Sequence, residues 1–100
     1  MTPHIMVVGT SEPQDFQLLE DGVAKDGTGW DVDIEWRDSP DTPPTVAWLV
    51  QASGTVRVTG TESMAVGQYR FRFSLTDGGG DVGYVPNLDK EANVWRVVRL

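Results

Sequence analysis

Apolar and polar residues alternate strictly at positions 30–36. In this stretch, WDVDIEW, tryptophan, valine and isoleucine take the even positions and acids take the odd ones. A period of two puts every apolar side chain on one face of an extended strand, whereas a helix would scatter them around its circumference. The stretch therefore predicts a strand whose acids face water because its tryptophans face a core.

Other stretches share this strand character, and turn signals rich in glycine or proline separate them. The predicted strands are residues 4–9, 15–19, 30–36, 46–51, 55–60, 68–77 and 93–100, with one more that starts at Val82. The predicted turns are residues 20–22, 25–29, 39–44, 53–54 and 77–80. Residues 61–67 hold one helical turn at most. Seven or eight short strands at this spacing predict an all-β, antiparallel sandwich or barrel.

The length of 100 residues fits one domain over residues 1–100. A domain of this size can bury a hydrophobic core and fold without disulfides or bound metals. The sequence has no internal repeat and no linker. It has no cysteine, which excludes disulfides and thiolate metal sites. The residues predicted for the core are Val32, Ile34, Trp36, Trp48, Val56, Val58, Tyr69, Phe71 and Phe73.

The charge balance argues against two classes of partner. Fifteen acids against eight bases give a net charge of -7, whereas binding to phosphates requires a basic patch. We therefore expect neither nucleic acid nor an anionic membrane surface as a partner. No apolar run approaches the roughly 18 residues of a membrane span. The start of the chain lacks the basic and apolar regions of a signal peptide, so synthesis in the cytoplasm is expected.

The sequence offers little for catalysis, and we predict no catalytic residue and no enzyme activity. His4 is the only histidine, and none of the serines lies in a nucleophile elbow. Asp31, Asp33 and Glu35 share one strand face, which admits a paired-carboxylate site or a solvated face. The solvated face is preferred, with the arginines of the 68–77 strand as partners across the sheet.

Calcium is the one metal for which the sequence offers a candidate site. DGGGD at residues 77–81 puts two aspartates around three glycines, but the spacing does not fit an EF-hand loop. Glycines that adopt positive φ in a hairpin turn explain this stretch without a metal. We predict no metal site and no cofactor, and leave open whether a loop binds calcium.

The four tryptophans divide into two groups. Trp30, Trp36 and Trp48 are expected in the core. In the final strand both faces carry apolar residues and both carry arginine, a pattern expected of an edge strand at a subunit interface, where Trp and Arg are enriched. The predicted interface residues are Trp95, Arg96 and Arg99. The alternative is a carbohydrate-binding β-sandwich module that uses surface tryptophans.

Several short motifs follow one another in a recognisable order. A turn at Asp21–Gly22 and a D-x-T-G corner at Asp26–Gly29 precede the strand at 30–36. Gly67–Tyr69 gives G-x-Y, and a DGGG turn and Pro86–Asn87 follow it. Over roughly residues 10–90 the chain resembles the immunoglobulin-like N-terminal domain of tailed-phage baseplate upper proteins and related small phage virion modules. It departs from them at Gly27, where the family has an apolar residue, and in its proline-rich loop at 38–44.

The resemblance implies an immunoglobulin-like β-sandwich of seven to eight strands. It also implies a non-enzymatic virion structural protein that acts through protein–protein contacts. Its place would be the tail and baseplate, as an adaptor, or the capsid, as a decoration or completion subunit. The expected partners are other virion proteins and further copies of the chain, since virion modules repeat by symmetry. The expected location is the virion, after synthesis in the host cytoplasm.

Overall fold

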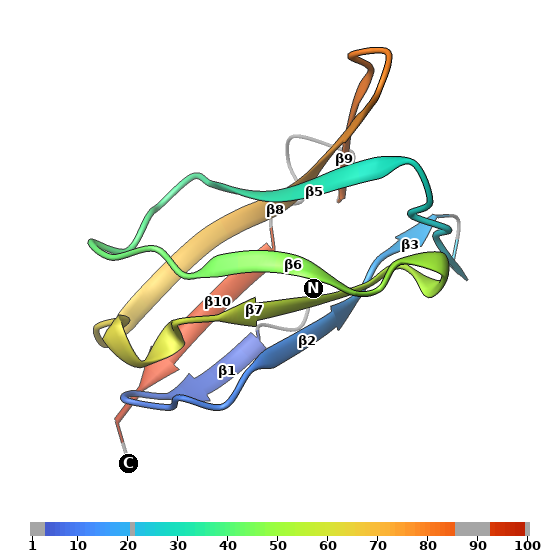
Figure 1. The fold of residues 1–100 in the computed structure, drawn as a ribbon. Coiled ribbons are helices and arrows are strands. Elements are labelled where there is room, and N and C mark those ends of the chain that lie inside the picture. The colour runs from blue at the N-terminus through green and yellow to red at the C-terminus, as the bar shows by residue number, and fades with distance from the viewer. Residues whose placement is uncertain (1–3, 21, 86–92, 100) are drawn as a thin grey trace.

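The computed structural model describes residues 4–20, 22–85 and 93–99. In this part of the chain the protein is built from strands and two short 3-10 turns (Figure 1). The elements are β1 (His4–Val7), β2 (Gln14–Gln17), β3 (Leu19–Glu20), β4 (Val23–Ala24), β5 (Trp30–Trp36), β6 (Thr45–Val50), η1 (Gln51–Ser53), β7 (Thr55–Thr59), η2 (Thr61–Ser63), β8 (Gly67–Asp77), β9 (Val82–Val85) and β10 (Asn93–Val98).

The strands form two sheets that face each other, which confirms the predicted all-β sandwich (Figure 1). The larger sheet has the order β1-β10-β8-β5, and β9 also pairs with β8. The smaller sheet has the order β2-β7-β6, and β3 and β4 form a separate hairpin. One pairing departs from the antiparallel prediction, because β1 runs parallel to β10.

The alternation in β5 has the predicted structural cause. Its tryptophans, valine and isoleucine are half-buried against the core, and its acids are exposed. On the neighbouring strand β8, the residues opposite Val32, Ile34 and Trp36 are Leu75, Phe73 and Phe71, all of them buried. Two apolar rows therefore lie side by side on the inner face of the larger sheet, and the acids of β5 line its outer face.

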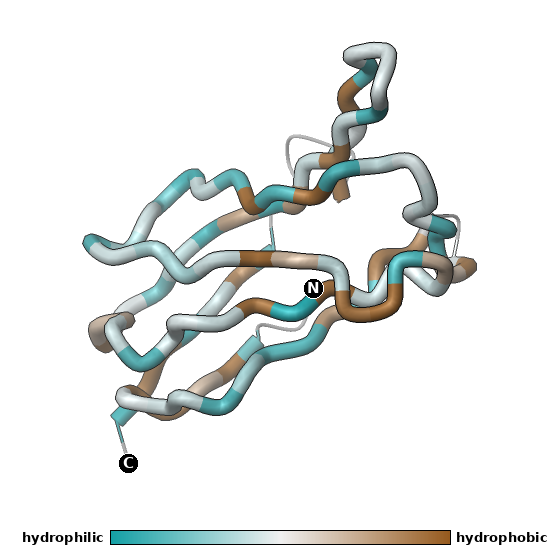
Figure 2. Tube along the Cα trace, in the orientation of Figure 1, coloured by the Kyte–Doolittle hydropathy of each residue, from teal (hydrophilic) through white to brown (hydrophobic). Residues whose placement is uncertain are grey.

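The core between the sheets contains the predicted residues and several others. Four of the nine are fully buried, namely Val56, Val58, Phe71 and Phe73. The other five, Val32, Ile34, Trp36, Trp48 and Tyr69, are half-buried and pack against the core. Further buried residues are Met6, Leu18, Met64, Leu75, Trp95 and Val97. Apolar residues recur along the strands of both sheets (Figure 2).

Aromatic rings join the two sheets near the centre of the sandwich. Phe16, on β2 of the smaller sheet, lies 5.9 Å from Phe71 and 5.6 Å from Phe73 of the larger sheet, measured between ring centroids. Trp95 of β10 lies 5.5 Å from Phe16. Tilted and edge-on ring pairs at these distances add stabilisation beyond the area they bury.

The predicted strand at 15–19 is interrupted at Leu18. The amide of Leu18 donates to the carbonyl oxygen of Gly54, and its own carbonyl oxygen accepts from the amide of Lys25, both at 2.8 Å. These bonds turn Leu18 into the core, where it is 2% exposed, and separate β2 from the β3–β4 hairpin. Gly54 has φ of +70°, which an L side chain rarely adopts.

The two predicted turn features around residues 61–67 and 77–80 have clear structural causes. The helical turn is η2, and its buried Thr61 donates a hydrogen bond from Oγ1 to the carbonyl oxygen of Thr10 at 2.8 Å. In the β8–β9 turn, Oδ1 of Asp77 accepts from the amides of Gly79 and Asp81, each at 2.9 Å. The predicted strand end at Pro86–Asn87 lies outside the described residues.

Candidate interaction surface

The structure places the three predicted interface residues in two different environments. Trp95 is 0% exposed, because the inward positions of β10 face the core. Its ring centroid lies 4.9 Å from His4 and 6.1 Å from Trp36. The prediction of Trp95 as an interface residue is therefore corrected: its indole packs inside the sandwich and does not reach the surface of the chain.

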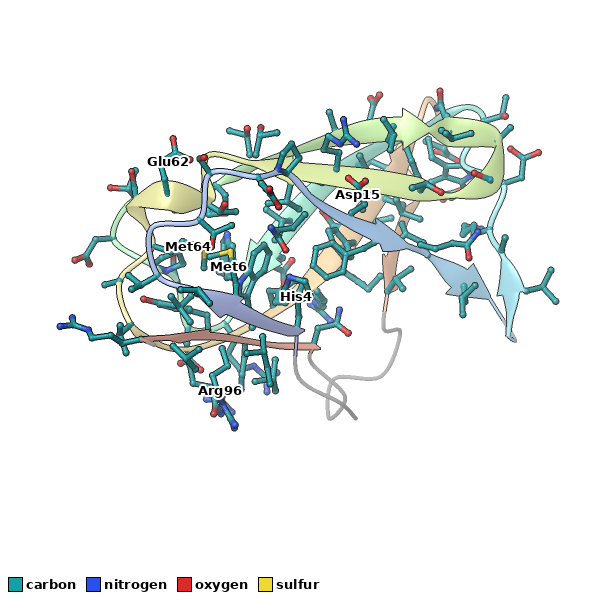
Figure 3. All side chains as sticks on the ribbon, turned by 90° about the horizontal axis from the view of Figure 1, so that it is seen from below. His4, Met6, Asp15, Glu62, Met64 and Arg96 are labelled. Atoms are coloured by element: carbon teal, nitrogen blue, oxygen red, sulfur yellow. The ribbon has the colours of Figure 1, made fainter. Side chains whose placement is uncertain are left out.

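Arg96 and Arg99 lie on the surface, as an interface requires. Arg96 follows Trp95 on β10 and so points to the outer face of the larger sheet, away from the side where His4 and Met6 lie between the sheets (Figure 3). Its Nη2 donates to Oε1 of Gln68 on β8 at 3.2 Å.

Arg96 lies beside an exposed apolar surface that the sequence analysis did not single out. On the neighbouring strand β1, Ile5 pairs with Arg96 and Val7 pairs with Val98. Ile5 is 58% exposed and Val7 36% exposed, although both are large and apolar. We call the outward residues of these two strands the β1–β10 face: Ile5, Val7, Val94, Arg96 and Val98.

A sequence signal for this face existed. The first strand, HIMVV, is apolar at odd and even positions alike, as the last strand largely is. A strand that is apolar on both faces is covered on both faces or has one apolar face in water. The periodicity does not distinguish these cases, so the exposure of Ile5 and Val7 required the structure.

The remainder of the outer face is charged and largely paired within the chain. Arg72 of β8 forms the predicted cross-strand ion pair with Glu35 of β5, with 2.7 Å between Nη2 and Oε1. Its guanidinium carbon also lies 3.7 Å from the ring centroid of Tyr84 on β9, a cation–π contact. Arg70 pairs with Asp38, which follows β5, and not with the acids of that strand. The acidic row is thus a solvated face, in which Glu35 pairs with an arginine across the sheet.

The described contacts of His4 are with aromatic rings and with the side chain of Gln14. Its ring lies 4.7 Å from Phe16, and Nε2 forms a 2.9 Å hydrogen bond with Oε1 of Gln14. Burial lowers the pKa of His4 below its usual value of 6.5, and the bond to Gln14 opposes this shift. The ring packs in the gap between β1 and β2 and meets no carboxylate in the described contacts.

The carboxylates of the described residues do not gather into a metal-ligand cluster of three or more groups. Asp77, in the predicted calcium candidate, uses its Oδ1 to cap the turn amides. Asp26 caps the corner in the same way, accepting from the amide of Thr28 at 2.9 Å, and hydrogen bonds from the side chain and then the amide of Thr28 lower its pKa. Both residues thus have a local role in the turns that they begin.

A second apolar surface lies at the end of the sandwich where β6 meets η1. Leu49 and Val50, at the end of β6, are 43% and 50% exposed. Leu19 and Val23, on the β3–β4 hairpin, are 49% and 67% exposed. The bonds of Leu18 to Gly54 and Lys25 hold this hairpin beside the β6–β7 connection. None of the four tryptophans is among the exposed large apolar residues.

Comparisons with protein-family models, with curated proteins and with solved structures find no match to this chain. In the part of the chain described, no helix has the length and apolar character needed to cross a membrane.

Proposed function

We propose that the chain is a non-enzymatic structural subunit of a bacteriophage virion, an adaptor of the tail and baseplate or a decoration or completion subunit of the capsid. The observation that carries the proposal is the order of the strands. The strand orders β2-β7-β6 and β10-β8-β5 follow the orders B-E-D and G-F-C of an immunoglobulin-like sandwich, and β1 adds a parallel strand beside β10. This order supports the fold that the resemblance implies, an immunoglobulin-like sandwich.

The placement of the motifs gives further support. The corner Asp26–Gly29 leads directly into β5, and Gly67–Tyr69 opens β8. The DGGG turn joins β8 to β9. These three motifs therefore lie at strand junctions, whereas Asp21 and Pro86–Asn87 lie outside the described residues. The β1–β10 face adds a surface suited to protein contact, since large exposed apolar residues beside an arginine are typical of such surfaces.

The carbohydrate-binding alternative has less support. Sugar binding by a β-sandwich needs aromatic rings that lie open on one surface. Trp30, Trp36 and Trp48 are half-buried against the core, and Trp95 is buried. The Nε1 atom of Trp48 is also occupied, because it donates to the carbonyl oxygen of Trp30.

The test is the composition of purified particles. Phage particles from a host that carries this gene would be purified on a density gradient and analysed by quantitative mass spectrometry. We expect peptides of the chain at a fixed stoichiometry to the major capsid or tail proteins. A chain that is abundant in the lysate and absent from intact particles would overturn the proposal. Antibody labelling in electron micrographs then separates head from tail.

A further inference from the structure

We propose that two copies of the chain form a two-fold dimer in which β1 of one copy pairs antiparallel with β1 of the other. The two larger sheets would then join into one continuous sheet. The proposal deepens the proposed function by naming the surface and the partner of one contact. It stands on the hydrogen-bonding edges of the two sheets and on the side chains beside them.

The backbone of β1 has hydrogen-bonding groups directed away from its neighbour. The amide of Val8 donates to the carbonyl oxygen of Val98 at 2.8 Å, so alternate residues of this strand bond to β10. The groups of Ile5 and Val7 therefore point to the open edge. The carbonyl oxygen of Val7 accepts from the amide and Oγ1 of Thr10, at 3.2 Å and 2.6 Å. In the contacts of the described residues, the amides of Ile5 and Val7 and the carbonyl of Ile5 have no partner, so they are the groups that a new strand would bond.

The opposite end of the larger sheet is blocked against strand addition. On β5, the carbonyl oxygen of Trp30 accepts from the indole of Trp48, and Oδ1 of Asp33 accepts from the amide of Ile34 at 2.8 Å. The acids of β5 add charge along this edge. Bonds of this kind and edge charges are means by which proteins prevent sheet edges from pairing.

The smaller sheet ends in strands that are also protected. β6 has a register shift between Trp48 and Val50, and bulges of this kind interrupt an edge ladder. β2 carries Asp15, which forms an ion pair with Arg57 at 2.8 Å. Among the edge strands of the two main sheets, β1 and β9, which pairs only with β8, include neither a bulge nor a charged acid or base in their described residues. β1 differs from β9 because it carries two exposed apolar side chains, Ile5 and Val7, whereas β9 carries Val82 alone.

The side chains beside this edge favour a second copy as the partner. Two chains with a net charge of -7 repel each other wherever their acids meet. The described outward positions of β1 and β10 carry no acid, and they carry Ile5 and Val7 as exposed apolar groups. A two-fold axis brings identical surfaces together, so these apolar residues meet their own equivalents. The apolar side chains and the absence of acids at these described positions coincide at this edge.

The first test uses the absence of cysteine from the chain. Ile5→Cys and Val7→Cys would each introduce one thiol at the edge, and Val82→Cys provides a control because Val82 is 52% exposed on β9. Under mild oxidation, we expect at least one of the two edge variants to form disulfide-linked dimers about tenfold faster than the control, through the raised local concentration. Equal rates at all three positions would overturn the proposal.

The second test distinguishes strand pairing from apolar contact alone. Hydrogen exchange measured over a range of chain concentrations should slow at the amides of Ile5 and Val7 as the dimer forms. Ile5→Lys should abolish this protection and the dimer, since an edge lysine discourages pairing, whereas Val82→Lys should keep both. Circular dichroism would confirm that both variants stay folded. A dimer whose Ile5 and Val7 amides exchange freely would contradict the proposal.

The salt dependence of association distinguishes the β1 dimer from a dimer held by contacts between Arg96 and the acidic β5 of another copy. Added salt screens the repulsion between two anionic chains, so sedimentation should show the β1 dimer strengthened. A dimer that dissociates in salt would overturn the proposal in favour of the charged contact. A chain that stays monomeric at every concentration would also overturn it, and would leave the virion role to be decided by the particle composition.

Discussion

Trp48 donates its indole N–H to the carbonyl oxygen of Trp30, with 2.8 Å between Nε1 and O. The bond crosses from β6 of the smaller sheet to β5 of the larger one. Gln51 strengthens the same connection, because its Nε2 donates to the carbonyl oxygens of Gly27 at 2.8 Å and Trp30 at 3.1 Å. The side chains of Trp48 and Gln51 therefore connect the two sheets on this side of the sandwich, because they donate hydrogen bonds to backbone carbonyl oxygens in and next to the corner before β5.

Substitution of Gly27 with alanine should destabilise the fold through this corner. A Cβ at Gly27 would lie 2.5 Å from Cη2 and 2.7 Å from Cζ2 of Trp48, so the indole would have to move and weaken its bond to Trp30. Forced overpacking of this kind costs about 1–3 kcal/mol. We expect that loss in the free energy of unfolding measured by urea denaturation.

Gly78→Ala is the matched control for the Gly27 substitution. A Cβ at Gly78 would meet no atom within 4 Å, and this glycine has no positive φ. We expect the free energy of unfolding of the control to change by less than about 0.5 kcal/mol. If Gly27→Ala proves as mild as the control, the packing of Trp48 on the corner is not what holds the two sheets here.

The corner also illustrates how far the sequence predicts this fold. Alternation placed β5 and its acids correctly, because a two-residue period has one structural meaning when the apolar side must be buried. In the sequence, Gly27 shows only as a departure from the pattern of the phage modules that the chain resembles. Its reason lies 21 positions along the chain, in the indole of Trp48. A contact so distant in sequence leaves no local periodicity to detect.

The interface residues show the same limit on the surface. The last strand is apolar on both faces, and nothing in its own pattern says which face is inward. The pairing of Trp95 with Tyr69, on the inner side of β8, decides it. Composition predicts Arg96 as an interface residue, and it lies on the surface. Its apolar neighbours Ile5 and Val7 come from the other end of the chain.

Truncation of Trp95 should therefore act on stability. Removal of a fully buried tryptophan leaves a cavity among aromatic rings, and Trp→Ala at such a site costs about 3–5 kcal/mol. We expect thermal and urea unfolding of the Trp95→Ala chain to show this loss at any concentration. An exposed hot spot would instead leave the stability of the isolated chain unchanged.

Arg96→Ala gives the contrast within the same strand. Arg96 is exposed and bonds to the side chain of Gln68, so its loss should change the free energy of unfolding by less than about 0.5 kcal/mol. Comparable losses for Trp95→Ala and Arg96→Ala would contradict the assignment of one residue to the core and the other to the surface.

Thr61 should be sensitive to the loss of its hydroxyl group. The residue is 0% exposed, and Oγ1 donates to the carbonyl oxygen of Thr10 in the β1–β2 connection. Thr61→Val keeps the shape and removes the donor, which costs about 1–3 kcal/mol where it leaves a buried acceptor unpaired. Thr59→Val, on an exposed position of β7, should change the free energy of unfolding much less. Equal effects in chemical denaturation would argue against a structural role for this bond.

His4 should make the stability of the chain depend on pH between neutrality and mild acid. Burial lowers the pKa of the folded chain below the unfolded value of 6.5, so over this range the unfolded chain binds more protons. The free energy of unfolding should therefore fall as the pH drops from above 6.5 through the folded pKa. The carboxylates with lowered pKa, Asp15, Asp26 and Asp38, lose their contribution only in stronger acid.

Because His4 is the only histidine, its imidazole signals in an NMR titration report this pKa directly. The substitution His4→Phe keeps a ring against Phe16 and Trp95 and removes the titrating group. We expect the pH dependence of urea unfolding above pH 5 to be lost in this variant, at the cost of the bond to Gln14. A His4 pKa above 6.5, or an unchanged pH dependence in the variant, would mean that the imidazole is not held neutral between β1 and β2.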